Sequence, residues 1–180
     1  MSQGTPASVT EQHMMLFGTI IQSFAQHEAL MQEIMAAVSG ADVTSIRLLI
    51  RGLDFTQRRD ALFNLLRHRA VPLNQIDQIR NYLQILQTYN TLRHDIAHAT
   101  WIGGVPQNSI RPLWLSHGPV AAIKPVHDTD GDSKPFIEDD DDRVTYTLDD
   151  LREIGVNLMA NCAEFRDYLI KVDLMSKPAA

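Results

Sequence analysis

The sequence predicts an all-α protein: a bundle of four to five helices with a small irregular or β-hairpin insertion, at about residues 102–146, before the last helix. Two patterns predict this fold. Apolar residues recur at three- and four-residue steps over most of the chain, as one face of an amphipathic helix requires. Five of the eight prolines fall between residues 106 and 135, where no continuous helix can run. The length of 180 residues suits one domain, expected over 8–175, with flexible ends at 1–7 and 176–180.

The first helix is expected to begin at the capping-box spacing of Ser8 and Glu11 and to end at Gly40. Helical spacing separates its apolar residues: Met14, Phe17, Ile21, Phe24, Met31, Met35 and Val38. Two shorter helices are expected over 43–53 and 56–69. Pro72 then breaks the chain, and Asn74 is the expected N-cap of a long helix that ends near Ala99.

The insertion begins where the helical periodicity stops. Short apolar runs at 112–115, 120–123 and 144–147 are candidate strands of a small hairpin or meander. Thr147 or Asp149 is expected to cap the last helix, which runs to about Val172. These helices can bury their apolar stripes only against one another, which is why a bundle is predicted.

The charge is distributed unevenly along the chain. The net charge is −6, yet residues 128–153 alone carry eleven acidic residues against three basic ones, which leaves about +2 for the rest. Residues 44–70 carry six arginines against two aspartates. Such a basic segment can meet phosphates, although arginines are also the ordinary solvated face of a helix.

Several classes of protein have no support in the sequence. The single cysteine, Cys162, cannot form an internal disulfide or a four-thiolate zinc site, and its place in an apolar series predicts a packing role. With no long apolar run and no signal-peptide pattern, we expect a soluble, cytoplasmic protein without membrane contact. Phosphate-binding loops, nucleophile elbows and dinucleotide fingerprints are not found.

The end of the long fourth helix is the segment richest in chemistry. It reads Leu-Arg-His-Asp-Ile-Ala-His-Ala-Thr-Trp over residues 92–101, with ionisable side chains crowded into two turns. Cations stabilise the negative end of a helix, which is a purely structural use. Continuing the apolar stripe of this helix leads to Asn90, Arg93 and Ala97, which we expect to form the polar floor of a groove.

Residues Arg93 to His98 match the R-x4-H signature of HEPN domains, and the following Ala99-Thr100-Trp101 is similar to the small-then-aromatic ending of many of them. The resemblance implies an α-helical bundle that dimerises and brings two motifs together. It also implies a metal-independent endoribonuclease of toxin–antitoxin or other defence systems, with RNA as substrate and an antitoxin protein as a further partner. The sequence departs from the family at His94, where asparagine or aspartate is commoner.

In this reading the catalytic residues are Arg93 and His98, and the supporting residues are His94, Asp95, Asn90 and Trp101. An imidazole serves as general acid or base, and a guanidinium is a fixed clamp for phosphate oxygens. A five-residue step places Arg93 and His98 about 140° apart on an ideal helix. They converge only if the helix end unwinds or a second subunit completes the site. We therefore expect a homodimer with a shared groove, and Tyr89 and Trp101 near its rim.

Three alternatives stay open. The same bundle can be a non-catalytic RNA- or protein-binding and dimerisation module whose motif only caps a helix. His94 and His98 share a helix face and can hold zinc, but the sequence shows no third ligand. Asp128 to Ser133 imitates half of a calcium loop, although its second half fails and a solvated acidic loop fits better. The expectation is a protein without metal or cofactor.

Overall fold

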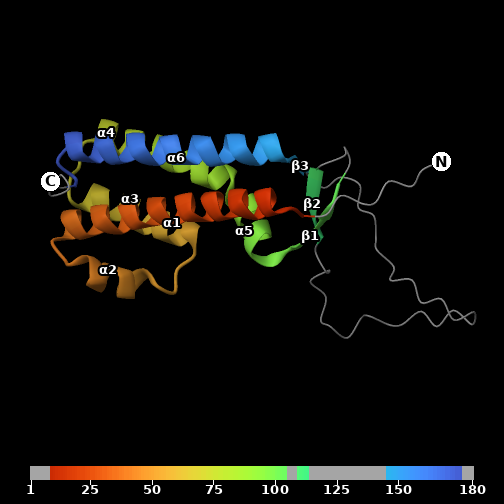
Figure 1. Ribbon diagram of the computed structural model, residues 1–180. Helices are drawn as coiled ribbons and strands as arrows, with labels where there is room; N and C mark the ends of the chain where they lie inside the picture. The colour runs from red at the N-terminus through yellow and green to blue at the C-terminus, as the bar shows by residue number, and fades with distance from the viewer. Residues whose placement is uncertain (1–8, 105–108, 114–144, 176–180) are drawn as a thin grey trace, which may run out of the picture.

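The computed structural model describes residues 9–104, 109–113 and 145–175, which form a helical bundle with a small antiparallel sheet at one end (Figure 1). The elements are α1 (Glu11–Ser39), α2 (Val43–Ile50), α3 (Phe55–His68), α4 (Leu73–Thr88), α5 (Asn90–His98), β1 (Thr100–Gly103), β2 (Ser109–Leu113), β3 (Tyr146–Thr147) and α6 (Leu148–Lys171). The predicted fold class, helices with a small hairpin sheet before the last one, is confirmed. The ends expected to be flexible, 1–7 and 176–180, lie outside the described residues.

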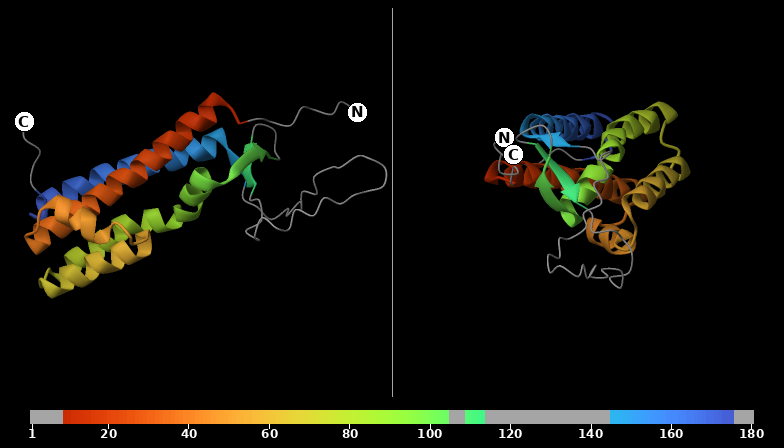
Figure 2. Two further views of the ribbon diagram at one scale, coloured as in Figure 1. Left: turned by 90° about the horizontal axis from the view of Figure 1, so that it is seen from below. Right: turned by 90° about the vertical axis from the view of Figure 1, so that its right-hand side faces the viewer.

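The described residues form six helices, because the long fourth helix predicted from the sequence is divided into two, α4 and α5. It is interrupted at Tyr89, whose φ of −101° and ψ of 10° depart from helical values. The backbone hydrogen bonds continue on both sides: the Tyr89 N–H donates to the Ile85 carbonyl at 3.2 Å, and the Arg93 N–H donates to the Tyr89 carbonyl at 3.0 Å. The interruption is therefore a local distortion between α4 and α5, and α5 continues from α4 toward the sheet (Figure 2).

Helix ends agree in part with the sequence prediction. Gly40 ends α1 in the left-handed conformation with φ 79°, as predicted, and Thr147 caps α6. The expected cap Ser8 lies outside the described residues, and Thr10 is the N-cap of α1 instead. Asn74 was wrongly expected to cap α4: the helix begins one residue before it, and the Pro72 carbonyl accepts its first backbone N–H groups.

Helix α1 lies at the centre of the fold and contacts α2, α3, α5 and α6. It runs beside α6 in the same direction, and both begin at the end that carries the sheet (Figures 1 and 2). Gly155 permits close packing here, since a Cβ atom on it would lie 3.4 Å from the Thr19 methyl group. The largest fully buried side chains come from every long helix and from β2: Phe165, Ile20, Leu30, Met31, Ile34, Leu62, Leu66, Ile76, Ile79, Leu83, Leu86 and Ile110.

The sheet has the order β1-β2-β3, with both pairings antiparallel. Trp101 pairs with Pro112 between β1 and β2, and Ser109 pairs with Thr147 between β2 and β3. The candidate strands at 112–115 and 144–147 overlap β2 and β3, whereas 120–123 lies outside the described residues. By joining the end of α5 to the start of α6, the sheet holds the motif helix against the bundle (Figure 1).

Candidate functional site

The motif helix α5 remains helical through His98, the last residue of the R-x4-H pattern. Ala99 is the first extended residue, with φ −83° and ψ 152°, and its N–H donates to the Asp95 carbonyl at 2.8 Å. The helix does not unwind before His98, so unwinding does not bring Arg93 and His98 together. Within one chain, the regular helix therefore directs Arg93 and His98 to different faces.

His94 and His98 lie one turn apart on the exposed face of α5. Their ring centroids are 4.8 Å apart with an interplanar angle of 55°, and both residues are exposed to solvent. Arg93, the neighbour of His94, is half-buried. The two imidazoles form a contiguous pair that an extended ligand can reach.

The expected polar groove floor of Asn90, Arg93 and Ala97 is wrong in its last member. Ala97 is exposed, Asn90 and Arg93 are half-buried, and the inward positions of α5 are Leu92 and Asp95. The apolar residues of α4 do not continue in phase into α5, because the helix is interrupted at Tyr89. The apolar face of one helix consequently does not predict that of the next.

Asp95 lies inward, away from the exposed histidines. It is buried, with 7% of its surface exposed. Burial raises the pKa of the Tyr146 hydroxyl in β3, and the nearby charges of Asp95 and Asp150 raise this pKa further. Asp95 therefore lies close to the sheet, where its position suits support of the helix end better than contact with a ligand.

Trp101 was expected near the rim of a groove, but it packs against the bundle. Its ring centroid lies 4.6 Å from that of Phe17 and 6.1 Å from that of Tyr146, and the residue is half-buried. Its indole Nε1 is buried and has no hydrogen-bond partner among the described residues. Tyr89, the other expected rim residue, is also half-buried. The structure makes Trp101 a link between β1 and α1.

Two further histidines are buried within α1. His13 completes the capping box of α1, because its Nδ1 accepts a hydrogen bond from the Thr10 N–H at 3.1 Å. In a neutral ring the proton is therefore on Nε2. Desolvation lowers the pKa of His13, and its Nε2 is buried with no hydrogen-bond partner in the part of the chain that the structure describes. His27 donates from Nδ1 to the Ser23 carbonyl at 2.8 Å and lies 2.8 Å through Nε2 from the Asn161 amide oxygen. Both positions are structural.

The arginine-rich segment 44–70 does not form one basic patch. Arg69 donates to the Val38 and Ser39 carbonyls at the end of α1, at 2.7 and 2.8 Å, and Arg58 pairs with Glu28 at 3.0 Å. Arg59 and Arg67, by contrast, line a groove between α3 and α4. These arginines thus divide between structural contacts and an open surface.

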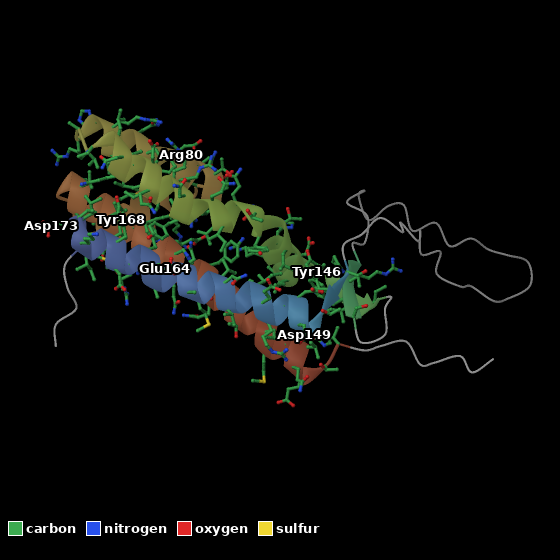
Figure 3. The ribbon with its side chains drawn as sticks, turned by 90° about the horizontal axis from the view of Figure 1, so that it is seen from above. Arg80, Tyr146, Asp149, Glu164, Tyr168 and Asp173 are labelled. Atoms are coloured by element: carbon green, nitrogen blue, oxygen red, sulfur yellow. The ribbon has the colours of Figure 1, made fainter. Side chains whose placement is uncertain are left out.

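This α3–α4 groove has a volume of about 560 Å³. Arg80 from α4 adds a third cation (Figure 3). Its guanidinium lies 5.2 Å from the centroid of the Phe63 ring and forms an ion pair with Asp77. The groove is lined by Arg59, Asp60, Phe63, Asn64, Arg67, Arg80, Leu83, Gln84 and Gln87. The charge pattern of the sequence indicates a basic segment that includes the arginines of α3, but the groove has no signal in the sequence, because only tertiary packing brings α4 beside these arginines.

Among the described residues, no group of three or more histidine, cysteine, aspartate or glutamate side chains could hold a metal ion. The zinc alternative at His94 and His98 thus gains no third ligand within that part of the chain. The calcium-loop imitation at Asp128 to Ser133 lies outside the described residues.

The search for related proteins yields no match to a family model, a curated protein or a solved structure. Within the same described residues, none of the helices is both long and apolar enough to cross a membrane.

Proposed function

We propose that this protein is a metal-independent endoribonuclease of the HEPN type that cuts RNA at a site shared by two subunits. The observation that carries the proposal is the exposed His94–His98 pair at the end of a regular helix, next to Arg93 in sequence. Metal-free RNA cleavage requires acid–base groups and a cation, and these side chains supply both.

The chemistry assigns a role to each side chain. An imidazole, that of His98, takes the proton of the ribose 2′-hydroxyl as its oxygen forms a bond to phosphorus. The bond from phosphorus to the 5′-oxygen then breaks, and an imidazolium returns a proton to that leaving oxygen. Arg93 stabilises the charge that develops on the phosphoryl oxygens with its planar fork of donors. His94 supports His98 through their ring contact, and Asp95, Asn90 and Trp101 hold the helix end.

The proposal includes a homodimer. On an ideal helix, Arg93 and His98 point about 140° apart, and α5 is helical over this step. A two-fold axis beside α5 places Arg93 of one subunit opposite His98 of the other, since an isologous contact brings the same patch from each subunit together. In this proposal the setting is the cytoplasm and a defence or toxin–antitoxin system, with an antitoxin protein as the partner that restrains cleavage.

The test is cleavage of a fluorescent single-stranded RNA in EDTA by wild-type protein and by His98→Ala. His68→Ala is a matched control, because His68 is also an exposed histidine at the last position of a helix. The expected result is cleavage that survives chelation, is lost in His98→Ala and is unchanged in His68→Ala. RNA that is bound but stays intact with wild-type protein would favour the non-catalytic binding module instead.

A further inference from the structure

We propose that the α3–α4 groove binds the phosphates of single-stranded RNA and leads the strand to His94 and His98. This inference deepens the proposed ribonuclease function and rests on it. Three properties of the groove carry it: the charge of its walls, the polar groups between those charges, and its alignment with the histidine pair.

The walls of the groove present more positive than negative charge. Three arginines and one aspartate line it, with Arg59 and Arg67 on α3 and Arg80 on α4. Arg59 and Arg80 pair with Asp60 and Asp77, whose side chains are 58% and 64% exposed. The Arg80–Asp77 pair is exposed on both sides and contributes little, so phosphate oxygens can replace this carboxylate at small cost, whereas Arg59 is only 21% exposed and also donates to Gln87.

Arg67 has weaker ties than its neighbours. Its described hydrogen bond is to the Asn64 amide oxygen at 3.5 Å, the limit of such a contact, and the residue is exposed. It is therefore the cation in the groove that a phosphate recruits most readily. Guanidinium groups bind phosphate through two parallel N–H donors, which a lysine cannot do.

The rest of the lining suits a nucleotide. Asn64, Gln84 and Gln87 contribute amides that can donate to or accept from sugar and phosphate oxygens. Because the guanidinium of Arg80 covers the ring of Phe63, a base would stack on the guanidinium plane and not on the ring. Bases of single-stranded RNA stack on arginine planes as well as on aromatic rings. A volume of about 560 Å³ also falls in the range of small-ligand sites.

The groove points along α4 toward the proposed cleavage site. On α4 the groove is lined by Arg80, Leu83, Gln84 and Gln87, and the exposed His94 and His98 follow on the next helix, α5. Helical backbone hydrogen bonds on both sides of Tyr89 join the two helices, and α5 continues from α4 toward the sheet, although the buried face changes at the interruption. At 1.5 Å per residue, Gln87 and His94 are separated by about 10 Å along the helix. A strand that leaves the groove in this direction therefore reaches the helix that carries the two imidazoles.

Binding is measured by fluorescence anisotropy of a labelled single-stranded RNA, in EDTA and in the His98→Ala background, which leaves the RNA intact. The groove variant is Arg67→Gln with Arg80→Gln. Its control is Arg47→Gln with Arg152→Gln, which removes the same charge elsewhere: Arg47 donates to an amide as Arg67 does, and Arg152 pairs with an aspartate three residues earlier as Arg80 does. Thermal melts establish that both variants are folded.

The groove variant is expected to weaken binding about tenfold and to lower the slope of log Kd against log salt by about 1.4, as loss of two phosphate contacts predicts. The control variant is expected to bind as the parent does. Equal affinity and equal salt slope for both variants would overturn the inference. So would inorganic phosphate or a mononucleotide that competes as strongly as the RNA, since the site would then serve a small ligand.

Failure of the groove and failure of the ribonuclease proposal give different results. If His98→Ala abolishes cleavage but the groove variant cuts RNA with unchanged KM, the groove inference is wrong and the cleavage site stands. If wild-type protein binds RNA through the groove but leaves it intact, the groove is supported as the nucleic-acid surface of a binding module and the ribonuclease proposal fails.

Discussion

The rings of His94 and His98 lie 4.8 Å apart on the exposed face of α5, whereas Asp95, which lies between them in sequence, is buried. This separation divides a short motif into two parts. The exposed part is available to a ligand, and the buried part fixes the helix end against the bundle. Substitutions on the two sides should consequently affect different properties of the protein.

His94→Ala should slow RNA cleavage without unfolding the protein. Because His94 supports His98 through their ring contact, its loss should lower the rate less than the roughly 10²–10⁴-fold expected for His98→Ala. The double variant should lose little more than His98→Ala alone, because residues that act as a unit are not additive. Single-turnover cleavage measures this, with Thr91→Ala, an exposed non-ionisable position of the same helix, as control. A wild-type rate in His94→Ala would show that His98 works without its neighbour.

Acid should destabilise the protein through His13. Burial lowers the pKa of His13 below the ordinary value of 6.5, so the folded protein binds fewer protons here than the unfolded chain does. The stability that depends on a neutral ring is complete above pH 6.5 and is lost as the pH falls through that value toward the lowered pKa. His13→Gln keeps an acceptor for the Thr10 N–H but does not titrate.

Thermal melts of wild type and His13→Gln between pH 7.5 and 5, in about half-unit steps, measure this difference. The drop in Tm on acidification should be smaller in the variant. His68→Gln is the control, since His68 is exposed at the end of α3 and should leave the pH dependence as in wild type. Parallel curves for wild type and His13→Gln would contradict the assignment.

Local signals in the sequence were sufficient for most of the fold. The left-handed stop at Gly40 and the cap at Thr147 both follow from one residue and its immediate neighbours. The interruption at Tyr89 has no such signal, because neither proline nor glycine marks it. The helical periodicity therefore predicted one continuous helix over α4 and α5. Continuing the buried face of α4 into α5 wrongly placed Ala97 inward.

The candidate site, like the fold, was predictable only where local sequence patterns determine it. Helical spacing places His94 and His98 on one face, and the structure brings their rings together. The inward position of Asp95 and the contact between Trp101 and Phe17 depend on the path of β1 back toward α1, which no local pattern encodes. The α3–α4 groove likewise exists only because residues 59–67 and 80–87 pack side by side.

Replacing Gly40 or Gly18 by alanine should change the free energy of unfolding in opposite directions. Gly40 has φ 79°, a conformation that an L side chain adopts only under strain, whereas Gly18 lies inside α1. A Cβ atom added at either position meets nothing within 4 Å, so only the backbone distinguishes them. Gly40→Ala should lower the free energy of unfolding by about 1 kcal/mol, and Gly18→Ala should raise it by about 0.5–1 kcal/mol. Urea unfolding monitored by circular dichroism gives both values, and a loss of stability in Gly18→Ala would indicate that this exposed position is covered by another chain.

Complementation between two inactive variants should test whether the cleavage site is shared. In a symmetric dimer, the site formed by Arg93 of one subunit and His98 of the other is lost in both Arg93→Ala and His98→Ala homodimers. A heterodimer of the two variants has one site in which both residues are replaced and one in which both are intact. Equal mixing after subunit exchange makes about half of the dimers heterodimers, so about a quarter of the wild-type activity should return.

The measurement is cleavage of labelled RNA by each variant alone and by the mixture, with sedimentation establishing that both variants are dimers. A mixture of His98→Ala with Arg93→Ala/His98→Ala is the control, because no combination of those chains restores a complete site. Activity in the first mixture and none in the second would establish that the residues act across the interface. A first mixture as inactive as its parents, or a wild-type protein that sediments as a monomer of 20.3 kDa while cutting RNA, would instead place the whole site in one chain.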